Sequence, residues 1–158
     1  MECTTWGACM RSVAVAFTVA ILLMLAAFPQ YAVAADTDEM TAEKATAKAV
    51  PAAEAWLKLV DSGAYEESWD QAAPMFKDRV QKNDWTNAAQ AVREPLGPVA
   101  ERTVETTRYA TELPGAPDGH YVIIQFRTVF ANKKNSVETV TPMLTEDGTW
   151  RVSGYYIK

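Results

Sequence analysis

The spacing of the apolar residues changes from one period to another midway along the chain. Between Pro51 and Val92 apolar side chains recur every three or four residues, the spacing that places them on one face of an α-helix. After Val99 they alternate with polar residues, and Thr, Val, Tyr and Ile become frequent, as in half-buried β-strands. A chain with its helices before its strands is expected to fold as an α+β domain, with the helices on one face of an antiparallel sheet.

Three helices are predicted in the first half. The first follows Pro51, which suits the first turn of a helix, and its apolar stripe consists of Ala53, Trp56, Leu57 and Val60. The second spans Tyr65 to Phe76 and is broken or kinked by Pro74. The third begins behind Asn83 and stops before Pro95, with the stripe Trp85, Ala88, Ala89 and Val92.

Four strands are predicted in the second half. The segments between them are rich in Gly, Pro, Asn and Asp, which favour tight turns, and the strands themselves cover residues 99–113, 121–131, 137–144 and 149–157. Short turns between successive strands predict an antiparallel meander. The expected fold is therefore three helices packed on one face of a curved, cone-like, four-stranded sheet.

The alternation also predicts which side chains face the helices. In the second strand the inward set is Val122, Ile124, Phe126, Thr128 and Phe130. In the last strand the inward set is Trp150, Val152, Gly154 and Tyr156. A three-residue loop at Glu146–Gly148 would pair Leu144 with Trp150 and would place Glu138 opposite Tyr156.

An uncharged apolar run over residues 13–28 is typical of a secretory signal peptide. It follows Arg11 and precedes the small-residue motif that ends at Ala34, after which we expect cleavage, with Met10 as an alternative start. The run is shorter than the roughly 20 residues of a spanning helix, so a retained membrane anchor is the weaker interpretation. We expect an exported protein, periplasmic or secreted, that has no membrane contact after cleavage.

Residues 35–50 and 51–158 differ in composition. The first segment is rich in Ala, Thr, Lys and acidic residues without an aromatic one, which indicates a polar tether or a loosely held helix. The second has the length and apolar content of one domain. Both cysteines, Cys3 and Cys9, precede the leader, so the cleaved chain would have no disulfide, thiol nucleophile or cysteine-bound metal. The net charge of −5, without a long basic run, argues against nucleic-acid binding.

Several motifs in order resemble one family. They are the run 53–63 (AEAWLKLVDSG), the run 68–70 (SWD), the loop 113–119 (LPGAPDG) and the two closing segments 137–144 (VETVTPML) and 150–156 (WRVSGYY). Over residues 52–158 the chain resembles a family of exported bacterial proteins, domain-of-unknown-function family 4019 (DUF4019). The order of elements is also similar to the cone-shaped fold of the nuclear-transport-factor-two and cystatin-like groups. Neither resemblance implies a reaction.

The only histidine, His120, follows Gly119 at a predicted hairpin tip. It is expected to be an exposed turn residue. A serine-histidine-acid site needs a histidine held by a carboxylate, and a multi-histidine metal site needs more than one. No metal site and no cofactor are therefore predicted.

Glu138 and Tyr156 are the one pair that offers acid-base chemistry. A carboxylate and a phenol facing an apolar cavity can exchange protons with a substrate and stabilise developing charge. Both residues lie near strand ends, so a solvated position at the rim is the favoured interpretation and catalysis the alternative.

The aromatic residues are the other candidates for a site. Four tryptophans and several partners could line a ligand box, for which the candidates are Trp69, Tyr109 and Phe126. At helical or strand spacing such side chains more often form a core. The uncovered sheet face, with Tyr121, Ile123 and Val129, could join two copies of the chain in a homodimer.

Two hypotheses for function follow. The first is a small exported binding or interaction module without catalysis, whose partner is a small molecule or a protein. The second is a cofactor-free isomerase or hydratase that acts on a small apolar carbonyl compound through the carboxylate-tyrosine pair.

Overall fold

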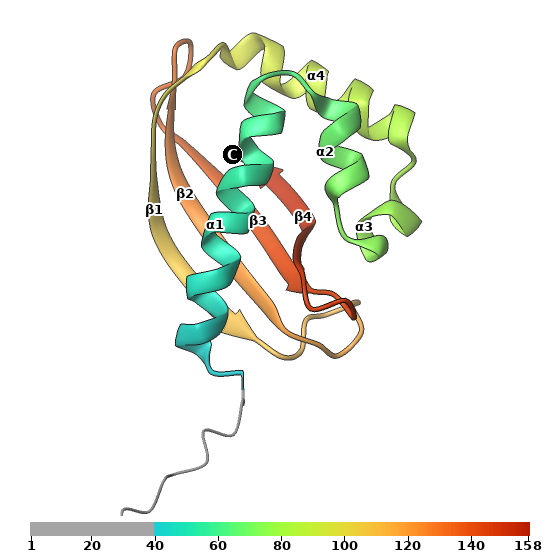
Figure 1. Ribbon diagram of the computed structural model, residues 1–158. Helices are drawn as coiled ribbons and strands as arrows, with labels where there is room; N and C mark the ends of the chain where they lie inside the picture. The colour runs from blue at the N-terminus through green and yellow to red at the C-terminus, as the bar shows by residue number, and fades with distance from the viewer. Residues whose placement is uncertain (1–39) are drawn as a thin grey trace, which may run out of the picture. The chain divides into compact units, whose positions relative to one another are not determined.

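Four helices precede four antiparallel strands in residues 40–158, the part of the chain that the computed structural model describes (Figure 1). The elements are α1 Ala42–Asp61, α2 Tyr65–Gln71, α3 Pro74–Arg79, α4 Lys82–Leu96, β1 Val99–Ala110, β2 Tyr121–Phe130, β3 Ser136–Leu144 and β4 Trp150–Ile157. The α+β prediction is confirmed. The predicted signal peptide, its cleavage site and residues 35–39 lie outside the described residues.

Helix α1 begins nine residues before the expected start at Pro51, which lies inside the helix. Thr41 caps it by accepting a hydrogen bond from the backbone N–H of Lys44. Its buried stripe continues upstream through Ala45 and Ala49, both fully buried. Residues 42–50 are therefore a packed half of α1 and not a tether or a loose helix.

The expected break at Pro74 divides the second predicted helix into two, so the prediction of three helices was one too few. Pro74 begins α3, where its missing N–H is harmless. Helix α4 starts behind Gln81 and extends through Pro95 to Leu96, and Gly97 ends it with φ of 72°. Its buried residues are Trp85, Ala89 and Arg93, whereas the predicted stripe residue Val92 is 44% exposed.

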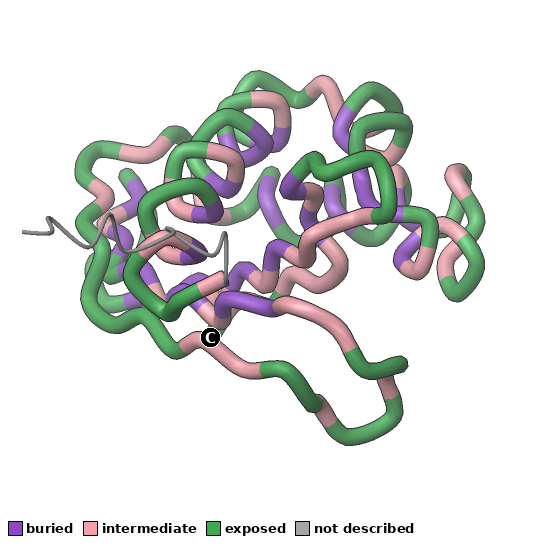
Figure 2. Tube along the Cα trace, turned by 60° about the horizontal axis from the view of Figure 1, so that its bottom comes forward, coloured by how far each residue is buried: buried purple, intermediate pink, exposed green. Residues whose placement is uncertain are grey.

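The sheet is an antiparallel meander in the order β1-β2-β3-β4, as predicted. Helix α1 contacts all four strands, and the ribbon shows it lying across the sheet (Figure 1). Buried and less buried residues alternate along β2 and β3, so one face meets the helices (Figure 2). The inward set of β2 is the predicted one.

The last strand departs from the predicted register at one point. Leu144 pairs with Trp150 and Pro142 with Val152, as expected, but Thr141 then pairs with Gly154 because β4 contains a bulge at Ser153. An extra residue turns the following side chains to the opposite faces of the sheet.

The core lies between the inner sheet face and the helices. Trp56, Trp85 and Trp150 are all at least nine-tenths buried in it, which confirms that they are core residues. The Trp56 ring contacts Trp85 and Tyr155, with centroids 5.6 and 5.5 Å away. No helix in residues 40–158 has the length and hydropathy to cross a membrane.

Candidate functional site

Glu138 of β3 is fully buried, and four side chains donate hydrogen bonds to its carboxylate. Oε1 accepts from Nη1 of Arg93 at 3.1 Å and from the hydroxyl of Tyr155 at 2.6 Å. Oε2 accepts from Nε of Arg102 at 2.7 Å and from the hydroxyl of Thr128 at 2.6 Å. A carboxylate has about four lone-pair sites, so Glu138 has no free acceptor.

Asp61 connects the same two arginines from the end of α1. Its Oδ1 lies 2.6 Å from Nη2 of Arg93, and its Oδ2 lies 2.6 Å from Nη1 of Arg102. The side chains of Arg93 and Arg102 are 5% and 13% exposed. The Asp61 side chain is 25% exposed, so it joins the cluster from the surface. Two guanidinium groups and two carboxylates make the cluster electrically neutral, which allows Glu138 and Arg93 to be ionised in the core.

Six elements bring this cluster together. Asp61 ends α1, Arg93 belongs to the buried face of α4, and Arg102 lies on β1 opposite Thr128 of β2. The remaining members are Glu138 of β3 and Tyr155 of β4. We refer to Asp61, Arg93, Arg102, Thr128, Glu138 and Tyr155 as the buried ion cluster.

The cluster changes the ionisation of its members. Burial raises the pKa of the Tyr155 phenol well above its ordinary value, and the neighbouring charge of Glu138 raises it further. Burial alone would lower the pKa of Arg102, but its hydrogen bonds to Asp61 and Glu138 outweigh that effect and raise it. The phenol thus stays protonated and the guanidinium stays charged at neutral pH.

The expected pair of Glu138 and Tyr156 does not form. Ile157 lies opposite Glu138, and Tyr156 is 58% exposed. The bulge at Ser153 turns Tyr155 inward in its place. The expectation that Glu138 is a solvated rim residue was also wrong, because the two arginines neutralise its charge within the core.

An open groove of about 750 Å³ lies beside the buried ion cluster. It is formed by the end of α1, the start of α2 and one side of α4, and its lining residues are Val60 to Glu67, Thr86, Gln90, Arg93, Glu94, Gly97 and Pro98. Asp61 and Arg93 belong to both the groove and the cluster, whereas Glu138 and Tyr155 do not line the groove. Two of the six cluster residues, Asp61 and Arg93, therefore form part of the groove wall.

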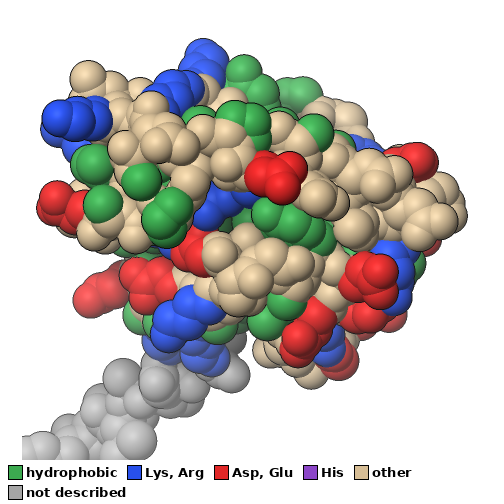
Figure 3. Space-filling view, turned by 90° about the horizontal axis from the view of Figure 1, so that it is seen from above, with side chains coloured by type: hydrophobic (Ala, Val, Ile, Leu, Met, Phe, Trp, Pro, Cys, Tyr) green, Lys and Arg blue, Asp and Glu red, His purple; other side chains and the backbone are tan. Residues whose placement is uncertain are grey.

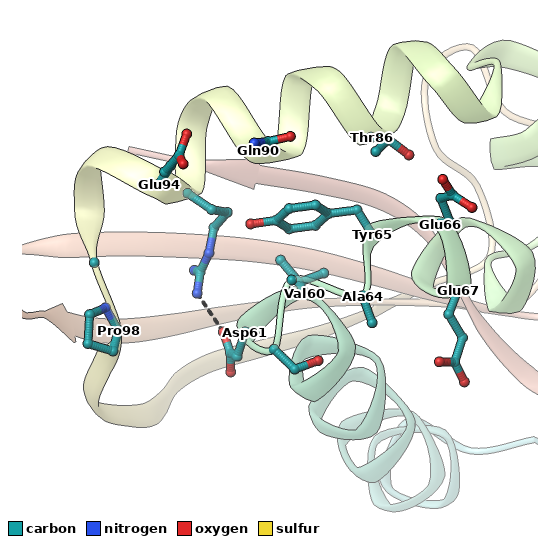
Figure 4. A pocket seen from close by; sticks show the side chains of 14 residues that line it. Val60, Asp61, Ala64, Tyr65, Glu66, Glu67, Thr86, Gln90, Glu94 and Pro98 are labelled. Carbon is teal, nitrogen blue, oxygen red and sulfur yellow. Dashed lines mark hydrogen bonds and ion pairs between the residues drawn. The ribbon is translucent and has the colours of Figure 1, made fainter.

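Figure 4 shows the Tyr65 ring between α4 and the end of α1, with the Asp61–Arg93 ion pair at one end of the groove. Glu66 lies at the other end, on the side of Thr86 (Figure 4). In the space-filling view a basic side chain is set back in a hollow beside acidic ones (Figure 3). The groove is thus polar and charged, with one aromatic wall.

The candidate ligand-box residues Trp69, Tyr109 and Phe126 do not line this groove. Phe126 is 1% exposed within the core. The Trp69 indole donates to the backbone oxygen of Val80, and the ammonium groups of two lysines lie over its ring, 5.6 Å and 5.2 Å from the centroid. All three belong to or pack against the core.

His120 is partly buried and not an exposed turn residue. Its Nδ1 lies 2.5 Å from the hydroxyl of Tyr109, and the two rings stack. Tyr121, expected on the uncovered sheet face, is fully buried and donates to the backbone oxygen of Pro117. The loop after β1 therefore covers that end of the face.

Sequence reasoning missed Asp61, Arg93 and Arg102. One signal was present for Arg93, which follows Trp85 and Ala89 at successive intervals of four residues and so continues the buried stripe of α4. Asp61 and Arg102 carry no local signal, because their partners lie 32 to 41 residues away in the chain. Within residues 40–158 there is no group of three or more His, Cys, Asp or Glu side chains placed to hold a metal ion.

Comparison with known proteins places residues 52–155 in a family model described as "Protein of unknown function (DUF4019)". The match covers about two thirds of the chain and nearly all of the described domain. No curated protein matches the sequence.

Proposed function

Because the chain belongs to the DUF4019 family, whose description assigns no reaction, we propose from its own residues that it is a small binding module without catalysis of its own. The observation that carries the proposal is an open groove whose lining includes the Asp61–Arg93 ion pair. A volume of about 750 Å³ lies within the range of small-molecule sites.

The alternative function, a cofactor-free isomerase or hydratase, has less support. A general base must offer a free lone pair within reach of substrate. Glu138 is fully buried, it already accepts four hydrogen bonds, and it does not line the groove. Catalysis by a carboxylate-tyrosine pair would require the buried ion cluster to open first.

The binding proposal can be tested by mapping backbone amide shifts of the purified protein with four probes of different chemistry. The probes are spermidine, glutarate, 1,8-octanediol and glucose. Saturable shifts confined to the groove residues with at least one probe are expected. If no probe shifts these amides, the groove is not a small-molecule site and the proposal fails.

The enzymatic alternative can be tested on the same purified protein by a deuterium-exchange experiment. Cyclohexanone in deuterated buffer would gain deuterium next to its carbonyl group if an acid-base pair acted on it. We expect no exchange above the rate in buffer. Exchange that is lost in both Glu138→Gln and Tyr155→Phe would contradict the binding-only proposal.

Export is part of the proposal and rests on the sequence of the leader. We expect the exported protein to begin at Ala35, after the motif Ala32-Val33-Ala34. Intact-mass measurement of the protein recovered outside the cytoplasm tests this. A mass that still includes residues 13–28 would show that the apolar run is retained.

The proposal has two further parts, a cone-like curvature of the sheet and the association of two copies of the chain in a homodimer. Register shifts in β1 and the bulge in β4 support a curved sheet, since bulges bend strands. On the uncovered face Tyr156 is 58% exposed and could meet a second copy. Sedimentation equilibrium of the protein and of Tyr156→Asp would test the dimer, which the substitution should dissociate.

A further inference from the structure

The lining of the groove contains more acidic than basic side chains. Among the described residues that line the groove, Arg93 is the only basic one, and both its ion pairs belong to the buried ion cluster. Glu66, Glu67 and Glu94 also line the groove, and none of them forms an ion pair within residues 40–158. The groove therefore has an excess of three carboxylates.

Two helices also end at the groove. The last residues of α1, Val60 and Asp61, and the residues at the end of α4, Glu94 and Gly97, are among its lining. The C-terminal end of a helix carries a partial negative charge, which favours a cation nearby. Both helix ends thus add to the negative potential of the groove, whereas the start of α2 adds a partial positive charge beside Glu66 and Glu67.

Glu94 is the acidic residue that the fold itself does not explain. Glu66 and Glu67 lie in the first turn of α2, where the helix dipole stabilises a carboxylate. Glu94 lies near the C-terminal end of α4, where the same dipole disfavours it. A cation bound in the groove would stabilise the Glu94 carboxylate and so offset this unfavourable interaction with the helix dipole.

The walls supply groups that suit an organic cation. The half-buried Tyr65 ring lies along the groove, and an aromatic face attracts an ammonium group (Figure 4). The hydroxyl of Thr86, also in the lining, is buried without a hydrogen-bond partner in the described residues. A ligand with an ammonium group could therefore contact the Tyr65 ring in the groove.

The carboxylates are spread along the groove and do not converge on one point. They extend from the start of α2 to the end of α4, and within residues 40–158 no set of three acidic side chains is placed around a metal ion. Separated charges of this kind fit a ligand whose positive charges are also separated by aliphatic chain.

We propose that the groove binds an aliphatic polyamine, a flexible small molecule that carries two or more primary or secondary ammonium groups. Its ammonium groups pair with Glu66 and Glu94, and its methylene chain passes over Tyr65. The inference rests on the proposed binding function and specifies the ligand class of that same groove.

Calorimetric titration of the purified protein with spermidine tests the proposal, together with amide-shift mapping of the same complex. We expect one saturable site at the groove, and binding about threefold weaker in Glu66→Gln or Glu94→Gln and about tenfold weaker in the double variant. The matched controls are Glu101→Gln and Glu112→Gln, two exposed acids outside the groove, which should bind spermidine as the parent does. All four acids are exposed, so the melting temperature should change only by the small helix-dipole contributions, slightly down in Glu66→Gln and slightly up in Glu94→Gln.

Other outcomes would overturn the polyamine inference in distinct ways. Equal weakening in the controls would mean that net charge, and not the groove, attracts spermidine. If the peptide Gly-Lys-Gly shifts the groove amides and spermidine does not, the occupant is a lysine side chain of a protein. If glutarate or 1,8-octanediol binds there and spermidine does not, the polyamine inference fails while the binding function stands.

Discussion

The hydroxyl of Tyr155 lies 2.6 Å from Oε1 of Glu138 and donates a hydrogen bond to this fully buried carboxylate. Tyr155 faces the core only because β4 is bulged at Ser153, and its neighbour Tyr156 faces solvent for the same reason. One inserted residue thus decides which of two adjacent tyrosines completes the buried ion cluster. Replacing each of these two tyrosines in turn therefore measures the contribution of this hydrogen bond to the stability of the protein.

We expect Tyr155→Phe to lower the free energy of unfolding by about 1 to 3 kcal/mol, because it leaves one lone pair of a buried carboxylate without a donor. Tyr156→Phe should change it by less than about 0.5 kcal/mol. Urea denaturation of both variants measures the difference. Equal effects would contradict the register of β4.

Stability at alkaline pH should depend on the same phenol. Burial raises the folded-state pKa of Tyr155, so its contribution is fully present below the unfolded pKa of about 10 and is lost as pH rises from there toward the folded pKa. Urea melts between pH 9 and 11 should show a steeper loss in the parent than in Tyr155→Phe. The pKa of Tyr121 is also raised by burial. The Tyr155→Phe variant, which keeps Tyr121, should therefore still lose some stability as pH rises. If parent and variant show the same slope, Tyr155 is not desolvated.

Breaking the buried ion cluster should cost far more than breaking an ion pair at the surface. Arg93→Met leaves Asp61 and Glu138 short of one counter-charge, for which we expect a loss of about 3 to 5 kcal/mol. The control is Arg127→Met, which removes an exposed arginine that pairs with Glu105, and it should cost less than about 1 kcal/mol. Denaturant melts give both values. A small loss for Arg93→Met would mean that water reaches the Glu138 carboxylate.

Two core tryptophans should respond differently to replacement by phenylalanine. Truncation of either Trp56 or Trp150 to alanine should cost about 3 to 5 kcal/mol, because each is a large buried side chain. The Trp56 indole donates to the backbone oxygen of Ser68 at 2.7 Å, whereas Nε1 of Trp150 has no partner in the described residues. Trp56→Phe should therefore destabilise the protein by about 1 kcal/mol more than Trp150→Phe. A reversed order in denaturant melts would contradict these hydrogen-bond assignments.

Local pattern was sufficient to predict the class of fold. The change in apolar period separates helices from strands, Pro74 divides α2 from α3, and the turn at Gly148 sets the first pairs of β3 with β4. These features depend on backbone geometry and on side chains within a few positions of one another. The start of α1 was missed because an alanine stripe has a weak apolar signal, although small side chains let the helix approach the sheet closely.

The groove and the buried ion cluster were decided by tertiary structure. Asp61, Arg93 and Glu138 lie 32 and 45 residues apart along the chain, and each alone is an ordinary charged residue in the sequence. These residues come together because of where α1 and α4 end relative to the sheet. Tyr155 rather than Tyr156 joins them because of a bulge in β4 that no turn motif in the sequence predicts. The sequence by itself determined the elements and most of their buried faces, because periodicity is local. Only the packed structure determined which charges neutralise each other, because a charge can lie in a core only once its distant partners are in place.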